Sequence, residues 1–200
     1  MTESEVYLRD GMSGKLIEAS LFDEVTRAHL GLWERDWVPA MEAFRTGGTT
    51  GRKPEDSHWD WRRKAQAVRG MLGFHSFALV CGEQLQGLMM TNDVGSARLR
   101  EQFGKPLIYV DFVATAPWNR HRLQDPPRFR GVGQVFILAA IETSREAGFR
   151  GRVGLHSLPE AEPFYEGKCG FARLGPDFSH QNLTYFEMTE KQADAFRQNH

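Results

Sequence analysis

The chain has 200 residues, about the length of one domain, which is enough to bury one sizeable core. Its apolar fraction of 40% and charged fraction of 26% exclude the disordered, collagen-like and coiled-coil classes. The 25 Lys and Arg residues nearly balance the 26 Asp and Glu residues, for a formal net charge of −1. This balance argues against a general polyanion binder but leaves room for a local basic patch.

The sequence carries no sign of a membrane, an exported address or a metal. No apolar run approaches the ~18 residues of a membrane-spanning helix, and the N-terminus lacks a basic-then-apolar signal pattern. Cys81 and Cys169 are too few for a disulfide framework, and neither has a neighbouring histidine in the sequence to activate it. We expect a cytoplasmic protein with reduced thiols, no thiol nucleophile and no metal site.

The N-terminal third predicts two helices. Apolar residues fall near helical spacing over residues 21–44, with Ser20 as the expected N-cap. A second helix is expected over residues 58–72, with a weak cap signal from Ser57 and Asp60.

A glycine-rich run at residues 47–54 separates these two helices. It resembles a phosphate loop, but Lys53 is followed by Pro54 instead of Ser or Thr, and no strand precedes the run. We therefore interpret it as a loop that does not bind a nucleotide.

The rest of the chain alternates strands and helices. A helix that is apolar nearly all round is expected over residues 133–147, so it should be well buried. Ser157 and Glu160 predict a capping box for a short helix, and Thr189 and Gln192 another for the last helix. Strands are expected at residues 74–81, 85–91, 107–114, 152–157, 171–174 and 183–188. This order predicts one mixed α/β domain over residues 1–200.

The segment from Arg128 to Gly133 follows a predicted strand and opens the buried helix. It contains Arg128, Arg130, Gly131 and Gly133 in the pattern Arg-x-x-Gly-x-Gly. A helix N-terminus presents unpaired N–H groups and partial positive charge, glycines permit close approach, and arginines add charged contacts. Alone, such a pattern also occurs in ordinary tight turns.

About 30 residues later the chain reads Phe-Tyr, four further residues and Gly-Phe, from Phe164 to Phe171. Together with the first motif and its flanking elements, this arrangement resembles the GCN5-related N-acetyltransferase (GNAT) superfamily over residues 76–188. Residues 1–75 resemble it only in supplying a strand and the two helices on the substrate side.

The resemblance implies an α/β (α+β) fold in which helices flank a mixed, mostly antiparallel central sheet. Two central strands would splay apart and hold acetyl-CoA, the co-substrate, between them. The segment 76–200 would form the CoA-binding core and C-terminal strands. The pantetheine arm would pair with the strand end at Phe112, Val113, Ala114 and Thr115. The pyrophosphate would lie on the backbone N–H groups from Arg128 through Arg130, Gly131, Val132 and Gly133 to Gln134.

Three residues are candidates for proton transfer. Tyr165 stands where the family places the tyrosine that protonates the CoA thiolate, although a packing role is the alternative. Asp111, an acid in an otherwise apolar strand, is the first candidate for the base that deprotonates the amine, and an ion-paired or hydrogen-bonded strand carboxylate is the alternative. His156 on the following strand competes as the base, against the alternative of a buried structural histidine.

One departure from the family is a longer loop over residues 118–127. It is a lid, a contact for the adenine or 3′-phosphate of CoA, a determinant of the acceptor, or a surface insertion. The main prediction is acetyl transfer to a small-molecule or peptide amine by direct attack in a ternary complex, in a protein able to form a homodimer. An acetyltransferase acting on aminoacyl-tRNA is one alternative, with Arg120, Arg122, Arg128 and Arg130 as its basic patch. A non-catalytic CoA-binding module is the other.

Overall fold

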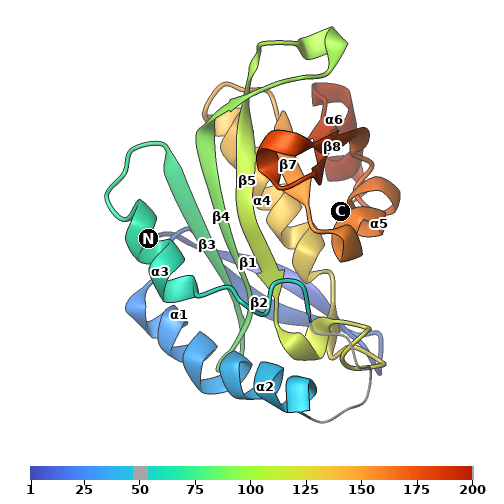
Figure 1. Cartoon of the computed structure of the whole chain (residues 1–200). Coiled ribbons are helices and arrows are strands. Elements are labelled where there is room, and N and C mark those ends of the chain that lie inside the picture. The colour runs from blue at the N-terminus through green and yellow to red at the C-terminus, as the bar shows by residue number, and fades with distance from the viewer. Residues whose placement is uncertain (47–53, 200) are drawn as a thin grey trace. The chain divides into compact units, whose positions relative to one another are not determined.

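The computed structural model describes residues 1–46 and 54–199 of the chain. The described strands follow one another in a mixed, mostly antiparallel sheet in the order β6-β1-β2-β3-β4-β5-β7-β9-β8, flanked by helices (Figure 1). The chain forms two compact units, Met1–Met89 with Val113–Gly133, and Met90–Phe112 with Gln134–His200.

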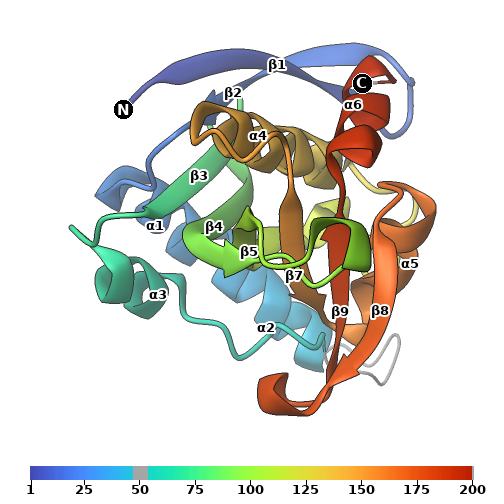
Figure 2. The same ribbon diagram turned by 90° about the horizontal axis from the view of Figure 1, so that it is seen from above.

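The first unit contains the N-terminal strands and helices. A long hairpin of β1 and β2 runs through it, and Ser20, Leu21 and Phe22 of β2 pair with β3 (Figures 1 and 2). Its elements are β1 (Glu3–Asp10), β2 (Leu16–Phe22), α1 (Arg27–Leu32), α2 (Val38–Thr46), α3 (Trp61–Val68), β3 (Phe74–Cys81), the first part of β4 (Gln84–Ser96), the end of β5 (Pro106–Thr115), β6 (Phe129–Arg130) and the start of α4 (Val132–Glu146).

The helix predicted from residue 21 begins six residues later. Ser20 belongs to β2 and is not a cap, because the backbone there pairs with β3. The true N-cap is Thr26, whose side chain accepts from the His29 amide while the His29 ring accepts from the Thr26 amide. A π-helical stretch at Trp33–Trp37 joins α1 to α2.

The second predicted helix is shorter than expected, at Trp61–Val68, and Asp60 caps it through the Arg63 amide. We interpreted the glycine-rich run at residues 47–54 as a loop that does not bind a nucleotide. Residues 47–53 of this run lie outside the part of the chain that the structure describes. The predicted strands at 74–81 and 85–91 are confirmed as β3 and β4.

The second unit is built around α4 and the C-terminal strands. Buried α4 residues such as Phe136, Ile137 and Ile141 are at most 1% exposed, which confirms the predicted buried helix. The β8–β9 hairpin pairs through β9 with β7, and α5 packs on this hairpin (Figure 2). Besides its parts of β4, β5 and α4, this unit contains β7 (Val153–Ser157), α5 (Glu162–Gly167), β8 (Ala172–Asp177), β9 (Leu183–Met188) and α6 (Glu190–Gln198).

The two predicted capping boxes differ in outcome. Thr189 and Gln192 form a complete box at the start of α6, as predicted. The Ser157–Glu160 box is wrong, because the Ser157 hydroxyl donates to the Leu158 carbonyl and a 3₁₀ turn at Pro159–Ala161 precedes α5.

Candidate active site

The start of α4 has the predicted strand–turn–helix arrangement. The short strand β6 pairs with β1, with Arg130 opposite Arg9, and α4 begins at Val132. Between them Gly131 has a φ of 98°, a conformation that side chains with a Cβ rarely adopt. The first turn of an α-helix leaves its N–H groups without intrahelical partners, so this end of α4 suits an anion.

The backbone of Arg128 does not belong to this anion site, contrary to the sequence prediction. Its N–H donates to the Trp118 carbonyl at 2.8 Å, and its carbonyl accepts from the Gly11 amide at 2.8 Å. The next amide, of Phe129, donates to the Asn119 side chain at 2.9 Å. The backbone N–H groups that remain candidates for binding the pyrophosphate are therefore those of the first turn of α4. The exposed Arg128 side chain is close to them in the sequence.

The long loop over residues 118–127 is anchored in the first unit. The buried Gln86 side chain accepts from the Trp118 indole and from Asn119, both at 2.9 Å. Arg120 makes two hydrogen bonds to the Asp56 carboxylate, at 2.7 and 2.8 Å. Trp118, Asn119 and Arg120, at the start of the loop, are therefore held in place by contacts with residues far away in the sequence.

Arg120 also reaches the strand end that was expected to pair with pantetheine. Its guanidinium donates to the Thr115 carbonyl at 2.9 and 2.7 Å. The Thr115 carbonyl therefore already accepts from Arg120, and the pairing of this strand end with pantetheine stays a prediction. Phe112 and Val113 are half-buried and Ala114 is 6% exposed on the same strand.

The second unit holds a pocket of about 300 Å³ that contains the predicted Asp111. The Asn92 amide nitrogen donates to both carboxylate oxygens of Asp111, at 3.0 and 2.8 Å, which fixes the carboxylate on the pocket wall. The lining residues come from the end of β4, from β5 and from the C-terminal hairpin: Asn92, Val94, Gly95, Ser96, Arg98, Tyr109, Asp111, His180 and Tyr185.

His156 lies behind this wall instead of facing the pocket. Its side chain is 3% exposed, with Nδ1 2.6 Å from the Tyr109 hydroxyl and Nε2 3.0 Å from Asp177 Oδ2. Burial lowers the pKa of His156, which the hydrogen bond to Asp177 opposes. His156 can therefore reach a molecule in the pocket only through Tyr109.

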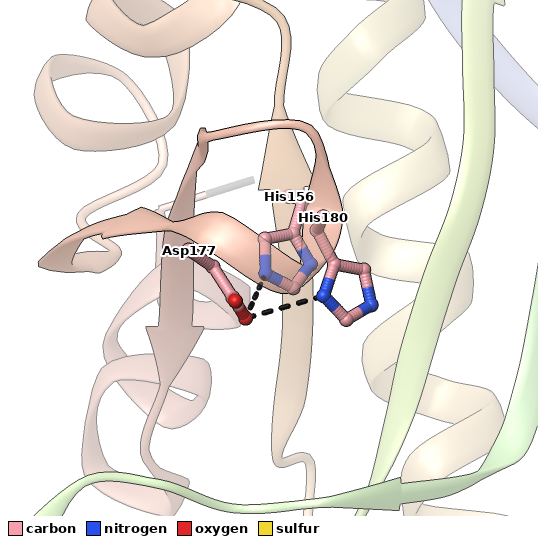
Figure 3. A group of neighbouring side chains, drawn as sticks. All are labelled: His156, Asp177 and His180. Carbon is pink, nitrogen blue, oxygen red and sulfur yellow. Dashed lines mark hydrogen bonds and ion pairs between the residues drawn. The ribbon is translucent and has the colours of Figure 1, made fainter.

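Asp177 Oδ2 lies 3.0 Å from His156 Nε2 and 3.2 Å from His180 Nδ1, as the dashed lines in Figure 3 mark. This Oδ2 atom also receives Arg98 at 2.5 Å, and Oδ1 receives the Ser179 amide and hydroxyl. The Ser179 and Arg98 hydrogen bonds hold the pKa of Asp177 far below its usual value, so it is a carboxylate acceptor at neutral pH.

The side-chain atoms of His156, Asp177 and His180 that could bind a metal ion lie within 4.8 Å of one another. Their arrangement, however, is not that of metal ligands. The two imidazole rings are stacked, with centroids 3.9 Å apart and planes within 5° of each other. A metal ion about 2 Å from each nitrogen should lie in the plane of each ring, and stacked parallel rings share no such plane. The Arg98 cation on the same carboxylate further opposes a metal ion.

Tyr165 is on α5, among aromatic side chains. It is 5% exposed and contacts Phe164, Phe171 and Phe186 edge-on or tilted. Burial raises the pKa of Tyr165, so the phenol keeps its proton. Tyr165 is not among the residues that line the pocket around Asp111.

The cysteines have the properties expected of unreactive thiols. Cys169 is 3% exposed, and burial raises its pKa to about 12. Burial also raises the pKa of Cys81, whose Sγ is 3.4 Å from the Glu18 carbonyl. Both thiols stay protonated at neutral pH.

Sequence reasoning missed Asn92, Tyr109, Asp177 and most of the pocket. Only Tyr109 carried a usable signal, because strand alternation places it on the same face as Asp111. The others come from segments that meet Asp111 or His156 only in the folded chain.

No protein-family model and no curated protein sequence matches the chain. Solved structures do, and they show the fold. FeeM, an N-acyl amino acid synthase from uncultured soil microbes, is 16% identical, covers 88% of this chain and 93% of its own, and has a TM-score of 0.56. The GNAT domain of PAT from S. lividans is 14% identical, with 93% and 96% coverage and a TM-score of 0.54.

A GNAT-family protein from Desulfovibrio desulfuricans is 14% identical, covering 86% of this chain and 99% of its own, with a TM-score of 0.53. The chain therefore has the GNAT fold, as the two sequence motifs predicted. Among the described helices, none combines the length and apolar character needed to cross a bilayer.

Proposed function

We propose that residues 1–200 form a single acyl-CoA-dependent N-acyltransferase domain that transfers acetyl from acetyl-CoA to a primary amine by direct attack in a ternary complex. The observation that carries this proposal is the Asp111 carboxylate, held on the wall of a pocket by Asn92 in a chain with the GNAT fold.

The residues at the start of α4 fit the diphosphate of a CoA molecule. Gly131 turns the chain into the helix, the first turn of a helix lacks intrahelical partners for its N–H groups, and Arg128 and Arg130 are exposed. Phe112, Val113 and Ala114 remain the proposed contacts of the pantetheine arm. Bound acetyl-CoA supplies an activated thioester carbon.

Asp111 is suited to hold the amine. A carboxylate fixed by Asn92 on the pocket wall places an acidic group where the ammonium group of the acceptor would bind, and pocket residues Tyr109 and Tyr185 provide aromatic walls. The ionised carboxylate thereby recruits the cationic form in which a free amine exists at neutral pH.

Tyr165 is the proposed donor of the proton that the leaving thiolate takes. A phenol whose pKa is raised by burial is protonated throughout the physiological range, as this role requires. With Asp111 and Tyr165, His156 is the third residue that we propose for proton transfer in this site.

The aminoacyl-tRNA alternative is weakened by one contact. Arg120 is one of the four arginines of the basic patch predicted for tRNA binding. It forms an ion pair with Asp56 and donates to the Thr115 carbonyl. Phosphate contacts dominate such binding, and this arginine cannot supply one without breaking the loop.

The test is a thiol-release assay with acetyl-CoA and a panel of amines that contains the amino acids, polyamines and aminoglycosides. For the best amine, Asp111→Asn should raise the KM of the amine about 10- to 100-fold, the loss of one charged contact, with the KM of acetyl-CoA within twofold. Tyr165→Phe should lower kcat at least about tenfold with unchanged CoA affinity.

Asp23→Asn, an exposed carboxylate in the first unit, is the matched control and should behave as wild type. An Asp111→Asn enzyme with wild-type KM for the amine would contradict the assigned role. Absence of thiol release with every amine would contradict the proposed function itself.

A further inference from the structure

Three side chains from separate strands form a continuous hydrogen-bonded chain that ends in the pocket. Asp177 on β8 contacts Nε2 of His156 on β7 at 3.0 Å, and Nδ1 of His156 contacts the Tyr109 hydroxyl on β5 at 2.6 Å. Tyr109 lines the pocket beside Asp111, whereas His156 does not. The chain therefore connects a buried imidazole to the space where the amine would bind.

The direction of each hydrogen bond follows from the charge on Asp177. An ionised carboxylate only accepts, so the His156 Nε2 carries the proton that it donates to Asp177. In the neutral ring Nδ1 is then the acceptor, and the Tyr109 hydroxyl donates to it. The Tyr109 oxygen keeps lone pairs with which to accept a further proton.

The proposed reaction needs such an acceptor. The acceptor nitrogen loses two protons on the way from ammonium to amide, and the CoA sulfur takes up one. An ordinary carboxylate near pKa ~4 is a poor acceptor for a proton from an amine near pKa ~10, whereas a free imidazole near ~6.5 is better matched. Burial lowers the pKa of His156 and reduces this advantage, which the hydrogen bond to Asp177 partly restores. Asp111 can thus hold the amine while another group removes its proton.

We infer that Tyr109 is a catalytic residue that takes a proton from the acceptor nitrogen as it passes its own to His156, and that His156 and Asp177 position and drive it. The inference rests on the proposed function and identifies the base of that site.

The step balances without any further reactant besides solvent water. The bound ammonium first gives one proton to solvent water, which leaves a neutral amine. The nitrogen lone pair then forms the bond to the thioester carbon as the carbon–oxygen π bond opens onto the oxygen. The nitrogen–hydrogen bond breaks as the Tyr109 oxygen takes the second proton. The Tyr109 hydroxyl proton moves to His156 Nδ1, and the resulting imidazolium donates to the Asp177 carboxylate. Collapse of the tetrahedral carbon then expels the thiolate, which is protonated separately.

Several charges face this relay and set its pH dependence. Arg98 and His180 lie against Asp177 and His156, and both oppose a positive charge on His156. Asp111 lies on the Tyr109 side and raises the pKa of Tyr109, after burial, which is the larger cause. The Tyr185 ring is 4.9 Å from that of His156, and its hydroxyl donates to the buried Glu187.

The kinetic test uses the whole enzyme, acetyl-CoA and the best amine of the panel. Tyr109→Phe removes one oxygen and should lower kcat at least 100-fold while the KM of acetyl-CoA stays within twofold. Tyr7→Phe, an exposed tyrosine on β1, is the matched control and should behave as wild type. A Tyr109→Phe enzyme within threefold of wild-type kcat would overturn the inference.

Positioning by Asp177 is tested by the pH profile. Activity should fall on the acid side as His156 becomes protonated, and Asp177→Asn should move that limb to lower pH, because the imidazolium loses its carboxylate. The double variant with Tyr109→Phe should be no slower than Tyr109→Phe alone, since the residues act as one unit. An unmoved acid limb or additive losses would contradict the relay.

A measurement on the protein alone separates this inference from the proposed function. Long-range ¹H–¹⁵N NMR at pH 7.5 should show neutral His156 with the proton on Nε2, and Asp194→Asn, a surface carboxylate, should leave that signal unchanged. A proton on Nδ1 would overturn the relay even if the enzyme acetylates amines. Absence of thiol release with every amine would refute the proposed function, and without that reaction the catalytic roles inferred for Tyr109, His156 and Asp177 fall with it, whichever tautomer is found.

Discussion

Replacing Glu187 by glutamine should destabilise the second unit by about 2–4 kcal/mol. The Glu187 side chain is fully buried, and its two oxygens accept four hydrogen bonds at 2.6–3.1 Å. Glutamine keeps one oxygen and turns a donor toward the other pair, so two bonds to a charged group are lost, at about 1.5–3 kcal/mol each. The removed cost of burying a charge offsets part of this loss.

The assay is thermal and urea unfolding of the variant beside the wild type. For a chain of this size, about 3 kcal/mol corresponds to a fall in Tm of roughly 6–12 °C. Glu142→Gln is the matched control, because that half-exposed carboxylate pairs with Arg197 on the surface and should cost at most about 1 kcal/mol. A Glu187→Gln protein within 1 kcal/mol of wild type would refute this reasoning.

Two further predictions follow from buried polar contacts in the first unit. Burial lowers the pKa of His29 below its unfolded value of 6.5, so stability is complete above pH 6.5 and is lost as pH falls toward the folded pKa; His29→Gln should flatten this acid limb in urea titrations, and an unchanged limb would contradict the assignment. Arg120→Lys should lower Tm nearly as much as Arg120→Ala, because lysine cannot bond both Asp56 and the Thr115 carbonyl; full stability in the lysine variant would show that the fork geometry does not matter.

The sequence patterns located most of the strands and the buried helix, because these have strong apolar periodicity. They did not locate β1 or β2, although the family resemblance implied one strand in residues 1–75. In β1 only Leu8 among eight residues is buried. A strand that is mostly exposed has little apolar signal of its own, and it forms because β2 and β6 pair with it. The error at Ser20 has the same origin, since pairing with β3 outweighed the helical spacing.

Some residues of the candidate site carry a local signal in the sequence, and others are brought together only by folding. Asp111 was found because an acid in an apolar strand is unusual, and the start of α4 because its glycine and arginine pattern is local. The partners of His156 are 21 and 47 residues away in the chain, so no local pattern could join them. Likewise, that Arg120 occupies the Thr115 carbonyl depends on Asp56, 64 residues away.

The central claim is that this chain binds acetyl-CoA, and calorimetric titration tests it most directly. We expect saturable one-to-one binding of acetyl-CoA at micromolar strength, and weaker binding when the charge of Arg130 is removed. Absence of binding up to millimolar concentration, for acetyl-CoA and for other acyl-CoAs alike, would contradict the account.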